Sequence, residues 1–197
     1  MKTVGIYLFD DVELLDFAGP YEVFTTCSRV AGRFGLAAPF RTLAIGPSTA
    51  AVTARAGLPM LPTHAIGDHP ELDVLIIPGG VVDAQLRERR VIDWIARTAR
   101  VTPLTASVCT GALLLAEAGL LDGRPATTHW EDLGQLRADY PKVIVREEGR
   151  WVDDDDIVTS AGIAAGIDMS LHIVARLCGS ELAARTARQM DYPWRPA

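Results

Sequence analysis

A cysteine lies where the pattern of the sequence changes from a buried strand to a helix. Residues 104–108 form an apolar run typical of a strand, Cys109 follows it, and helical spacing begins at Gly111. This arrangement predicts a nucleophile elbow, in which the small Gly111 permits a sharp turn between strand and helix. Backbone N–H groups and the helix dipole at such a turn favour a thiolate. The alternative is an inert core cysteine, which is the commoner fate of a lone Cys.

An acid and a pair of glycines are the other candidates for this site. Asp16 follows the first expected strand, and its apolar neighbours Leu15 and Phe17 would raise the pKa of its carboxyl group by desolvation. Such an acid can carry a proton to or from a cysteine adduct, although Asp16 would also suit a helix N-cap. Gly79 and Gly80 follow another strand, where their N–H groups can approach an oxyanion or simply form a turn.

These residues need a framework that brings the ends of several strands together. Apolar runs without polar alternation, typical of parallel strands covered on both faces, occur at residues 3–9, 40–45, 72–78, 104–108 and 157–160. Helical spacing occurs at residues 20–30, 84–100, 111–118, 131–140, 164–178 and 181–190. Shorter antiparallel pieces are expected at residues 52–55, 143–146 and 151–152. The alternation predicts an α/β fold, a three-layer sandwich around a mainly parallel sheet, with the active site at the carboxyl ends of the strands.

Composition narrows the classes of function. The chain has 25 acidic and 19 basic side chains, a formal charge of -6, which argues against nucleic acid as a partner. No apolar run approaches the roughly 20 residues that span a bilayer, and the N-terminus lacks the apolar core of a signal peptide. Three scattered cysteines are too few for a disulfide framework or a zinc site. We therefore expect one cytoplasmic domain over residues 1–197, without a metal.

Four segments, in this order along the chain, resemble the ThiJ/PfpI superfamily: LLDFAGPYEVF, IPGG, SVCTGALLLAEAGLLDGRPATTHW and TSAGIAAGIDMSLHIV. The resemblance runs from Met1 to about Tyr192 and implies a flavodoxin-like fold of the class I glutamine amidotransferase type. Cys-Thr-Gly followed by Ala-Thr-Thr-His-Trp is similar to the branch that contains isonitrile hydratases and the ligand domains of AraC-type regulators. Members are commonly dimeric, so the resemblance also implies a homodimer.

The resemblance implies a role for several residues. Cys109 would be the nucleophile and Asp16 its carboxylic acid partner, while Thr110 and Gly80 would line the pocket. Peptidase-like members have a histidine where this chain has Thr110, which argues against protease or amidase activity. His129 follows Cys109 by 20 residues, where related triads keep a histidine. It would either take part in catalysis or stack on Trp130 and hold a loop.

The activity implied is hydration of an isonitrile without a metal, nucleotide or redox cofactor. The Cys109 thiolate would attack the terminal carbon of R–N≡C, and Asp16 would supply the proton that completes a thioimidate. Water would then release an N-substituted formamide. Such a small, uncharged substrate would suit an apolar pocket lined by Phe17, Trp130 and Ile163.

Two other functions stay open. One is a sensing domain that binds a small metabolite without chemistry. Regulators of this branch carry a helix-turn-helix domain after the amidotransferase-like part, for which a chain ending at Ala197 leaves no room, and an intact Cys109 and Asp16 favour the enzyme. The other is a redox-sensing or glyoxalase-like protein, because exposed thiols of low pKa oxidise readily. Glyoxalase-type members usually have Glu at the acid position and a histidine near the sulfur, unlike Asp16 and Thr110 here.

Overall fold

Seven strands form the central sheet of the protein. They are β1 (Lys2–Tyr7), β2 (Phe40–Gly46), β5 (His64–Ala65), β6 (Val74–Ile77), β7 (Leu104–Val108), β10 (Trp151–Asp154) and β11 (Ile157–Ser160). The strand order is β10-β11-β7-β6-β1-β2-β5, and every pair is parallel except β10–β11. The five strands predicted from apolar runs are confirmed. The computed structural model describes residues 1–194, so residues 195–197 of the expected domain lie outside it.

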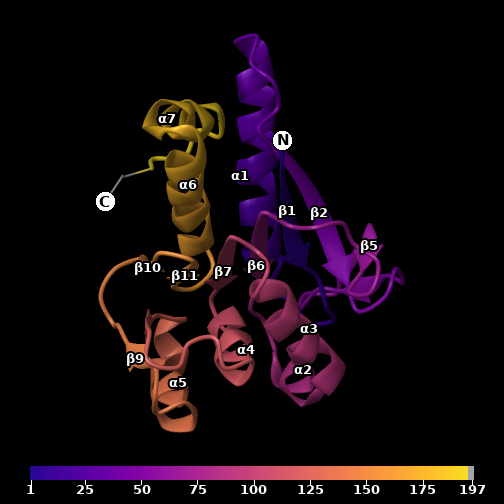
Figure 1. Cartoon of the computed structure of the whole chain (residues 1–197), viewed down its shortest axis with the longest axis vertical. Coiled ribbons are helices and arrows are strands. Elements are labelled where there is room, and N and C mark those ends of the chain that lie inside the picture. Colours follow the sequence, from indigo (N-terminus) through magenta and orange to yellow (C-terminus); the bar gives the residue numbers. More distant parts are fainter. Residues whose placement is uncertain (195–197) are drawn as a thin grey trace.

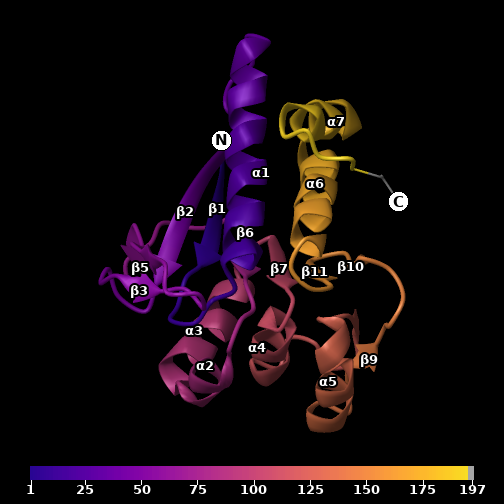
Figure 2. The same ribbon diagram turned by 180° about the vertical axis from the view of Figure 1, so that it is seen from behind.

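Helices cover both faces of this sheet, which gives the predicted three-layer sandwich. They are α1 (Leu14–Arg33), α2 (Asp83–Arg87), α3 (Arg89–Ala99), α4 (Gly111–Glu117), α5 (Leu133–Asp139), α6 (Ala165–Cys178) and α7 (Ser180–Gln189), with a short 3₁₀ helix η1 (Trp130–Asp132) before α5. Figures 1 and 2 show α1, α6 and α7 on one side of the strands and α2 to α5 on the other. The covered strands β6 and β7 are buried along their whole length, which is why their sequences lack polar alternation.

Two helices differ from their predicted bounds. Helix α1 begins at Leu14, so Pro20 lies inside the helix and does not start it. Because proline has no N–H, it cannot donate the helical hydrogen bond to the carbonyl of Asp16. The helix expected at residues 84–100 is two helices, since the backbone of Glu88 leaves the helical conformation (φ −85°, ψ 89°). The Glu88 carboxylate accepts the Arg90 N–H at 3.3 Å and so caps the second helix.

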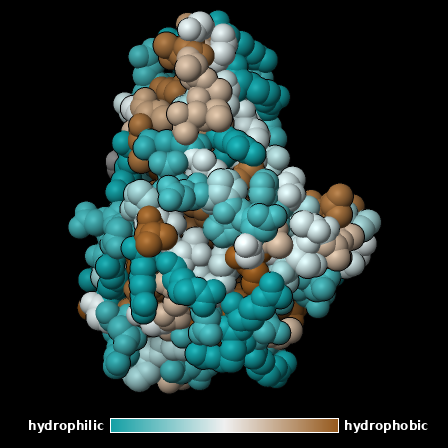
Figure 3. Space-filling model, turned by 45° about the vertical axis from the view of Figure 1, so that its right-hand side comes forward, coloured by the Kyte–Doolittle hydropathy of each residue, from teal (hydrophilic) through white to brown (hydrophobic). Residues whose placement is uncertain are grey.

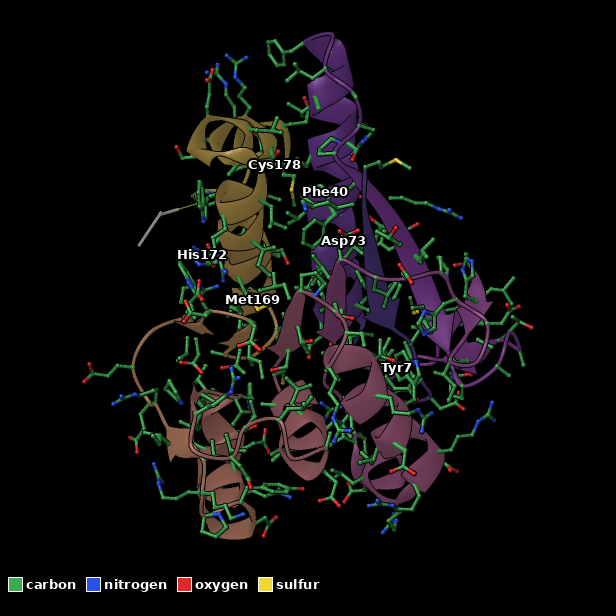
Figure 4. The ribbon with its side chains drawn as sticks, viewed as in Figure 1. Tyr7, Phe40, Asp73, Met169, His172 and Cys178 are labelled. Atoms are coloured by element: carbon green, nitrogen blue, oxygen red, sulfur yellow. The ribbon has the colours of Figure 1, made fainter. Side chains whose placement is uncertain are left out.

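The short pieces of sheet follow the prediction in two of three places. Strand β3 (Val52–Thr53) pairs antiparallel with β4 (Pro59–Met60), and β10 forms an antiparallel hairpin with β11. The third piece, β9 (Ile144–Val145), pairs parallel with β8 (Pro125–Ala126), so the expectation of an antiparallel strand there is wrong. His172, labelled in Figure 4, lies between α6 and the hairpin, where Nε2 is 2.5 Å from Asp153 Oδ2.

One face of the molecule is seen in a space-filling view. Figure 3 shows a largely hydrophilic face on which the hydrophobic patches are small and separate. The exposed large apolar side chains come from separate parts of the chain, among them Phe34, Leu61, Val101 and Trp130. Scattered apolar side chains of this kind are normal for a folded protein. Within residues 1–194, no helix combines the length and the apolar character needed to cross a membrane.

Candidate active site

Cys109 occupies the sharp turn between β7 and α4, as the sequence predicts. Its φ of 55° lies in the left-handed region, which is strained for a residue with a side chain. The turn is held because the Cys109 N–H donates to the Ser160 carbonyl at 3.2 Å and the Thr128 hydroxyl donates to the Cys109 carbonyl at 2.8 Å. A Cβ on Gly111 would lie 2.0 Å from the carbonyl oxygen of Ile77, so only glycine fits there. The predicted sharp turn from strand to helix at Cys109 is confirmed, while the role of its thiol as a nucleophile stays a prediction.

Asp16 lies in the first turn of α1 and is completely buried. Its Oδ2 accepts the Gly79 N–H at 3.1 Å, and its Oδ1 has no hydrogen-bond partner among residues 1–194. Burial raises the pKa of Asp16 to about 7, and the charge of Glu13 adds to this, while the Gly79 N–H and the Cys109 thiol lower it. The raised pKa expected from the sequence is confirmed, and the carboxyl group can gain or lose a proton near neutral pH.

The Cys109 thiol differs from the expectation that the turn favours a thiolate. Burial raises its pKa to about 12, and the nearby Asp16 charge raises it further, against a lowering by the Thr110 N–H. The seven-residue helix α4 therefore stabilises the thiolate less than desolvation destabilises it. Because the charge of Asp16 raises the pKa of Cys109, a thiolate forms more easily when Asp16 is protonated.

The Pro-Gly-Gly turn and Thr110 form a closed set of hydrogen bonds. The Thr110 hydroxyl donates to the Gly80 carbonyl and accepts the Gly80 N–H, both at 2.9 Å. A Cβ on Gly79 would lie 2.5 Å from Thr110 Oγ1 and 2.9 Å from Asp16 Oδ2, so this glycine allows the three residues to meet. The N–H groups of Gly79 and Gly80 are both used within the protein. They are not free for an oxyanion, because Asp16 and Thr110 already accept from them.

A cavity of about 370 Å³ opens above Cys109. Its apolar lining is Val81, Val82, Leu86, Leu113 and Ile163, and its charged lining is Glu13, Arg55, Asp83, Glu131 and Asp132. Ile163 is placed as expected, with a strained φ of 52°. Trp130 is 72% exposed, and Phe17 is buried against Tyr21, so both lie outside the cavity and the expectation for them is wrong. The charged lining was not predicted, because it comes from segments far apart in the sequence.

His129 lines the same cavity as Cys109. Its Nδ1 lies 3.4 Å from Asp132 Oδ2 and 3.7 Å from Glu131 Oε2. Its ring lies 5.7 Å from that of Trp130 at an interplanar angle of 42°, so the two rings are neighbours but are tilted and not stacked as the alternative expected. Asp132 was not predicted from the sequence, although its spacing of three residues from His129 is a signal that could have found it. Within residues 1–194, no three His, Cys, Asp or Glu side chains are grouped so that they could hold a metal ion.

Residues 2–176 match the model of the DJ-1/PfpI family. The chain belongs to this family. It is 34% identical to the isonitrile hydratase of Pseudomonas putida over 96% of its own length and 78% of the relative's. A ThiJ/PfpI family protein from Pseudomonas syringae has a similar structure, with a TM-score of 0.86 at 29% identity, over 99% of this chain and 76% of that one.

The relatives of this DJ-1/PfpI chain also include transcriptional regulators. It is 29% identical to the HTH-type transcriptional regulator GbdR of Pseudomonas aeruginosa over 97% of its own length, and spans about half (51%) of that regulator. The expected family and fold are thus confirmed. Because the relatives include both an enzyme and regulators, the function depends on what the site can do.

Proposed function

We propose that this protein is a cofactor-free hydratase that converts isonitriles to N-substituted formamides through a covalent bond to Cys109. The observation that carries the proposal is the pairing of the strained, buried Cys109 with the fully buried Asp16, each of which influences the pKa of the other. A buried acid beside a thiol can take its proton during attack and return it to the adduct. The 34% identity to an isonitrile hydratase supports the choice of substrate.

The first half of the reaction forms the thioimidate. The proton of the Cys109 thiol moves to the Asp16 carboxylate while the sulfur forms a bond to the terminal carbon of R–N≡C. Asp16 then gives the same proton to that carbon, which leaves R–N=CH–S–Cys109 and restores the Asp16 carboxylate. No atom is gained or lost apart from the substrate added.

The second half consumes water. The thioimidate nitrogen gains a proton, and the water oxygen bonds to the carbon and loses a proton, giving R–NH–CH(OH)–S–Cys109. The carbon–sulfur bond then breaks, and the hydroxyl proton returns to the Cys109 sulfur as the formamide R–NH–CHO leaves. The sum is R–NC plus H₂O to R–NHCHO.

This mechanism predicts how the rate depends on pH. Asp16 must be ionised to take the thiol proton, so kcat/KM should rise as the pH increases through about 7. Asp16→Asn removes the acceptor and should lower kcat/KM at least about 100-fold, together with the rise near pH 7. A pH profile of formamide formation measures both. Unchanged turnover by Asp16→Asn would contradict the role of this acid.

The experiment that tests the function is formamide formation from cyclohexyl isocyanide. Wild-type protein and Cys178→Ala, which changes a half-buried thiol in α6, should turn the substrate over, whereas Cys109→Ala should not. All proteins are compared with their thiols confirmed to be reduced. Absence of turnover by the wild-type protein would contradict the proposed hydratase activity.

A second candidate is a domain that binds a metabolite without converting it. Two observations favour it: the regulator relatives, and the fact that Gly79 and Gly80 have no N–H group left for a developing negative charge. The same assay distinguishes the two functions. Binding of the isonitrile without product, and with equal affinity in Cys109→Ala, supports the sensing domain.

A further inference from the structure

The cavity above Cys109 carries more charge than an uncharged isonitrile requires. A wholly apolar pocket would be enough for such a substrate. The lining instead includes one guanidinium, from Arg55, and four carboxylates, from Glu13, Asp83, Glu131 and Asp132. Arg55 and His129 together supply at most two positive charges. The lining therefore keeps an excess of negative charge whether His129 is protonated or neutral.

The guanidinium of the lining is already paired within the protein. Arg55 lies between β3 and β4, and its N–H donates to the Val12 carbonyl at 3.0 Å. This hydrogen bond holds Arg55 beside the next residue, Glu13, whose Oε2 lies 3.6 Å from Arg55 Nη1. Arg55 therefore offsets the charge of Glu13, and the carboxylates elsewhere on the wall are left without it.

The other three carboxylates reach the cavity from two sides of α4. Asp83 lies in the first turn of α2, whereas Glu131 and Asp132 lie in η1, just before α5. Figures 1 and 2 show α4 between α2 and α5. Glu131 and Asp132 approach the same nitrogen, His129 Nδ1, at 3.7 and 3.4 Å. Since one imidazole carries at most a single positive charge, it cannot balance both.

This negative charge acts on the residues proposed to react. Burial is the main reason that the pKa values of Cys109 and Asp16 are raised, and nearby charges add to it, among them Asp132 for Cys109 and Glu13 for Asp16. These carboxylates therefore lie near the proposed reacting atoms, because solvent screens the effect of distant ones. A positive charge held among them offsets this effect and makes the thiolate easier to form.

We infer that the substrate is an isonitrile whose substituent carries a positively charged group, such as an ammonium, held by Asp83, Glu131 and Asp132, an inference that rests on the proposed function. The isonitrile carbon meets Cys109, and the apolar side chains of the lining contact the carbon chain between the two ends. The ammonium group keeps its proton and all its bonds, so the atoms of the proposed reaction balance as before.

Three isonitriles that differ only in their last group test this inference. Hexyl isocyanide, 5-aminopentyl isocyanide and 6-isocyanohexanoate all carry a chain of five methylenes, which ends in a methyl, an ammonium and a carboxylate group. At about pH 8 the amine is protonated. We expect kcat/KM for the ammonium substrate to be about 10-fold above that for hexyl isocyanide, and kcat/KM for the carboxylate about 10-fold below it. In about 1 M NaCl both differences should shrink to about twofold, because salt screens charges and leaves apolar contacts.

Variants of the lining identify the carboxylates responsible. In the double variant Asp83→Asn and Glu131→Gln, the ratio of kcat/KM for the ammonium substrate to that for hexyl isocyanide should fall from about 10 to about 2. Because both substrates are measured on the same protein, the ratio does not depend on how much of a variant is folded. The control Asp139→Asn removes an exposed carboxylate of α5 that lies outside the lining, and should leave the ratio unchanged.

The outcomes separate the substrate class from the reaction. Turnover of hexyl isocyanide with equal kcat/KM for all three substrates overturns the inference while the hydratase stands. A preference for the ammonium substrate that persists in the double variant or in about 1 M NaCl also overturns it, because the carboxylates would then not be its cause. If the wild type converts none of the three and no cyclohexyl isocyanide, the proposed function has failed, and the inferred substrate class fails with it.

Discussion

The two sides of the cavity are built by different means. On the side of Asp16, Gly79 and Thr110, the groups are buried and joined by hydrogen bonds of 2.9–3.1 Å to backbone atoms. On the side of His129, the ring rests on Gly162 and meets carboxylates that are partly exposed to solvent. Solvent weakens the electrostatic contacts on the second side but not on the first. Cys109 therefore lies in a fixed setting, whereas the cavity wall around His129 can change with fewer consequences for folding.

The buried side should be the more sensitive to added volume. Gly111→Ala places a methyl group 2.0 Å from the backbone oxygen of Ile77, which cannot move without disturbing β6. We expect a loss of at least about 4 kcal/mol in the free energy of unfolding, enough to leave much of a marginal protein unfolded. Urea unfolding followed by circular dichroism measures it.

A matched glycine on the other side provides the control. Gly134 lies in α5, and a Cβ there would meet no atom within 4 Å. Gly134→Ala should therefore stabilise the protein by about 0.5 kcal/mol, because alanine loses less backbone entropy in a helix. Equal effects of the two substitutions would remove the distinction between the two sides.

The charge buried on the same side should cost stability above neutral pH. The pKa of Asp16 is about 7 in the folded protein against 3.8 for an exposed group, so the folded state binds the extra proton between these values. Folding stability then falls as the pH rises from about 4 to 7 and stays low above it. Asp16→Asn should stabilise the protein by up to about 4 kcal/mol at pH 8 and by almost nothing at pH 4. Urea unfolding of wild type and Asp16→Asn at both pH values measures this difference in stability. An equal effect of the substitution at pH 4 and pH 8 would contradict the raised pKa of Asp16.

The two sides of the cavity also differ in how well the sequence predicted them. The Cys109 elbow is a local feature, since the strand, the cysteine and the glycine are neighbours in the sequence, and it was predicted correctly. Pro20 gave the wrong start for α1, because proline is typical of the first turn of a helix, whereas here it lies in the seventh position of α1. Arg55 reaches the cavity only because distant segments meet in three dimensions, so local patterns did not locate it, whereas the spacing of Asp132 from His129 is a local signal that could have located that residue.

Substitutions of Thr110 test the hydrogen bonds that connect the turn at Cys109 to the Pro-Gly-Gly turn. Thr110→Val keeps the shape but leaves the N–H and the carbonyl of Gly80 without their partner, so we expect a loss of about 2 kcal/mol. Thr110→Ser keeps the hydroxyl and should lose less than about 1 kcal/mol. Thermal unfolding of the two variants side by side measures the difference. A valine variant as stable as the serine variant would mean that these hydrogen bonds contribute little.

The smallest effect is expected at the outermost residue of the exposed side. Trp130 is 72% exposed and lies outside the cavity, so Trp130→Ala should change the free energy of unfolding by less than about 0.5 kcal/mol and formamide kcat/KM by less than about twofold. Trp94, which is 3% exposed in α3, provides the same substitution in the core and should cost about 3–5 kcal/mol. A large loss of turnover in Trp130→Ala with stability intact would mean that this ring positions His129. A residue outside the cavity would then also contribute to turnover.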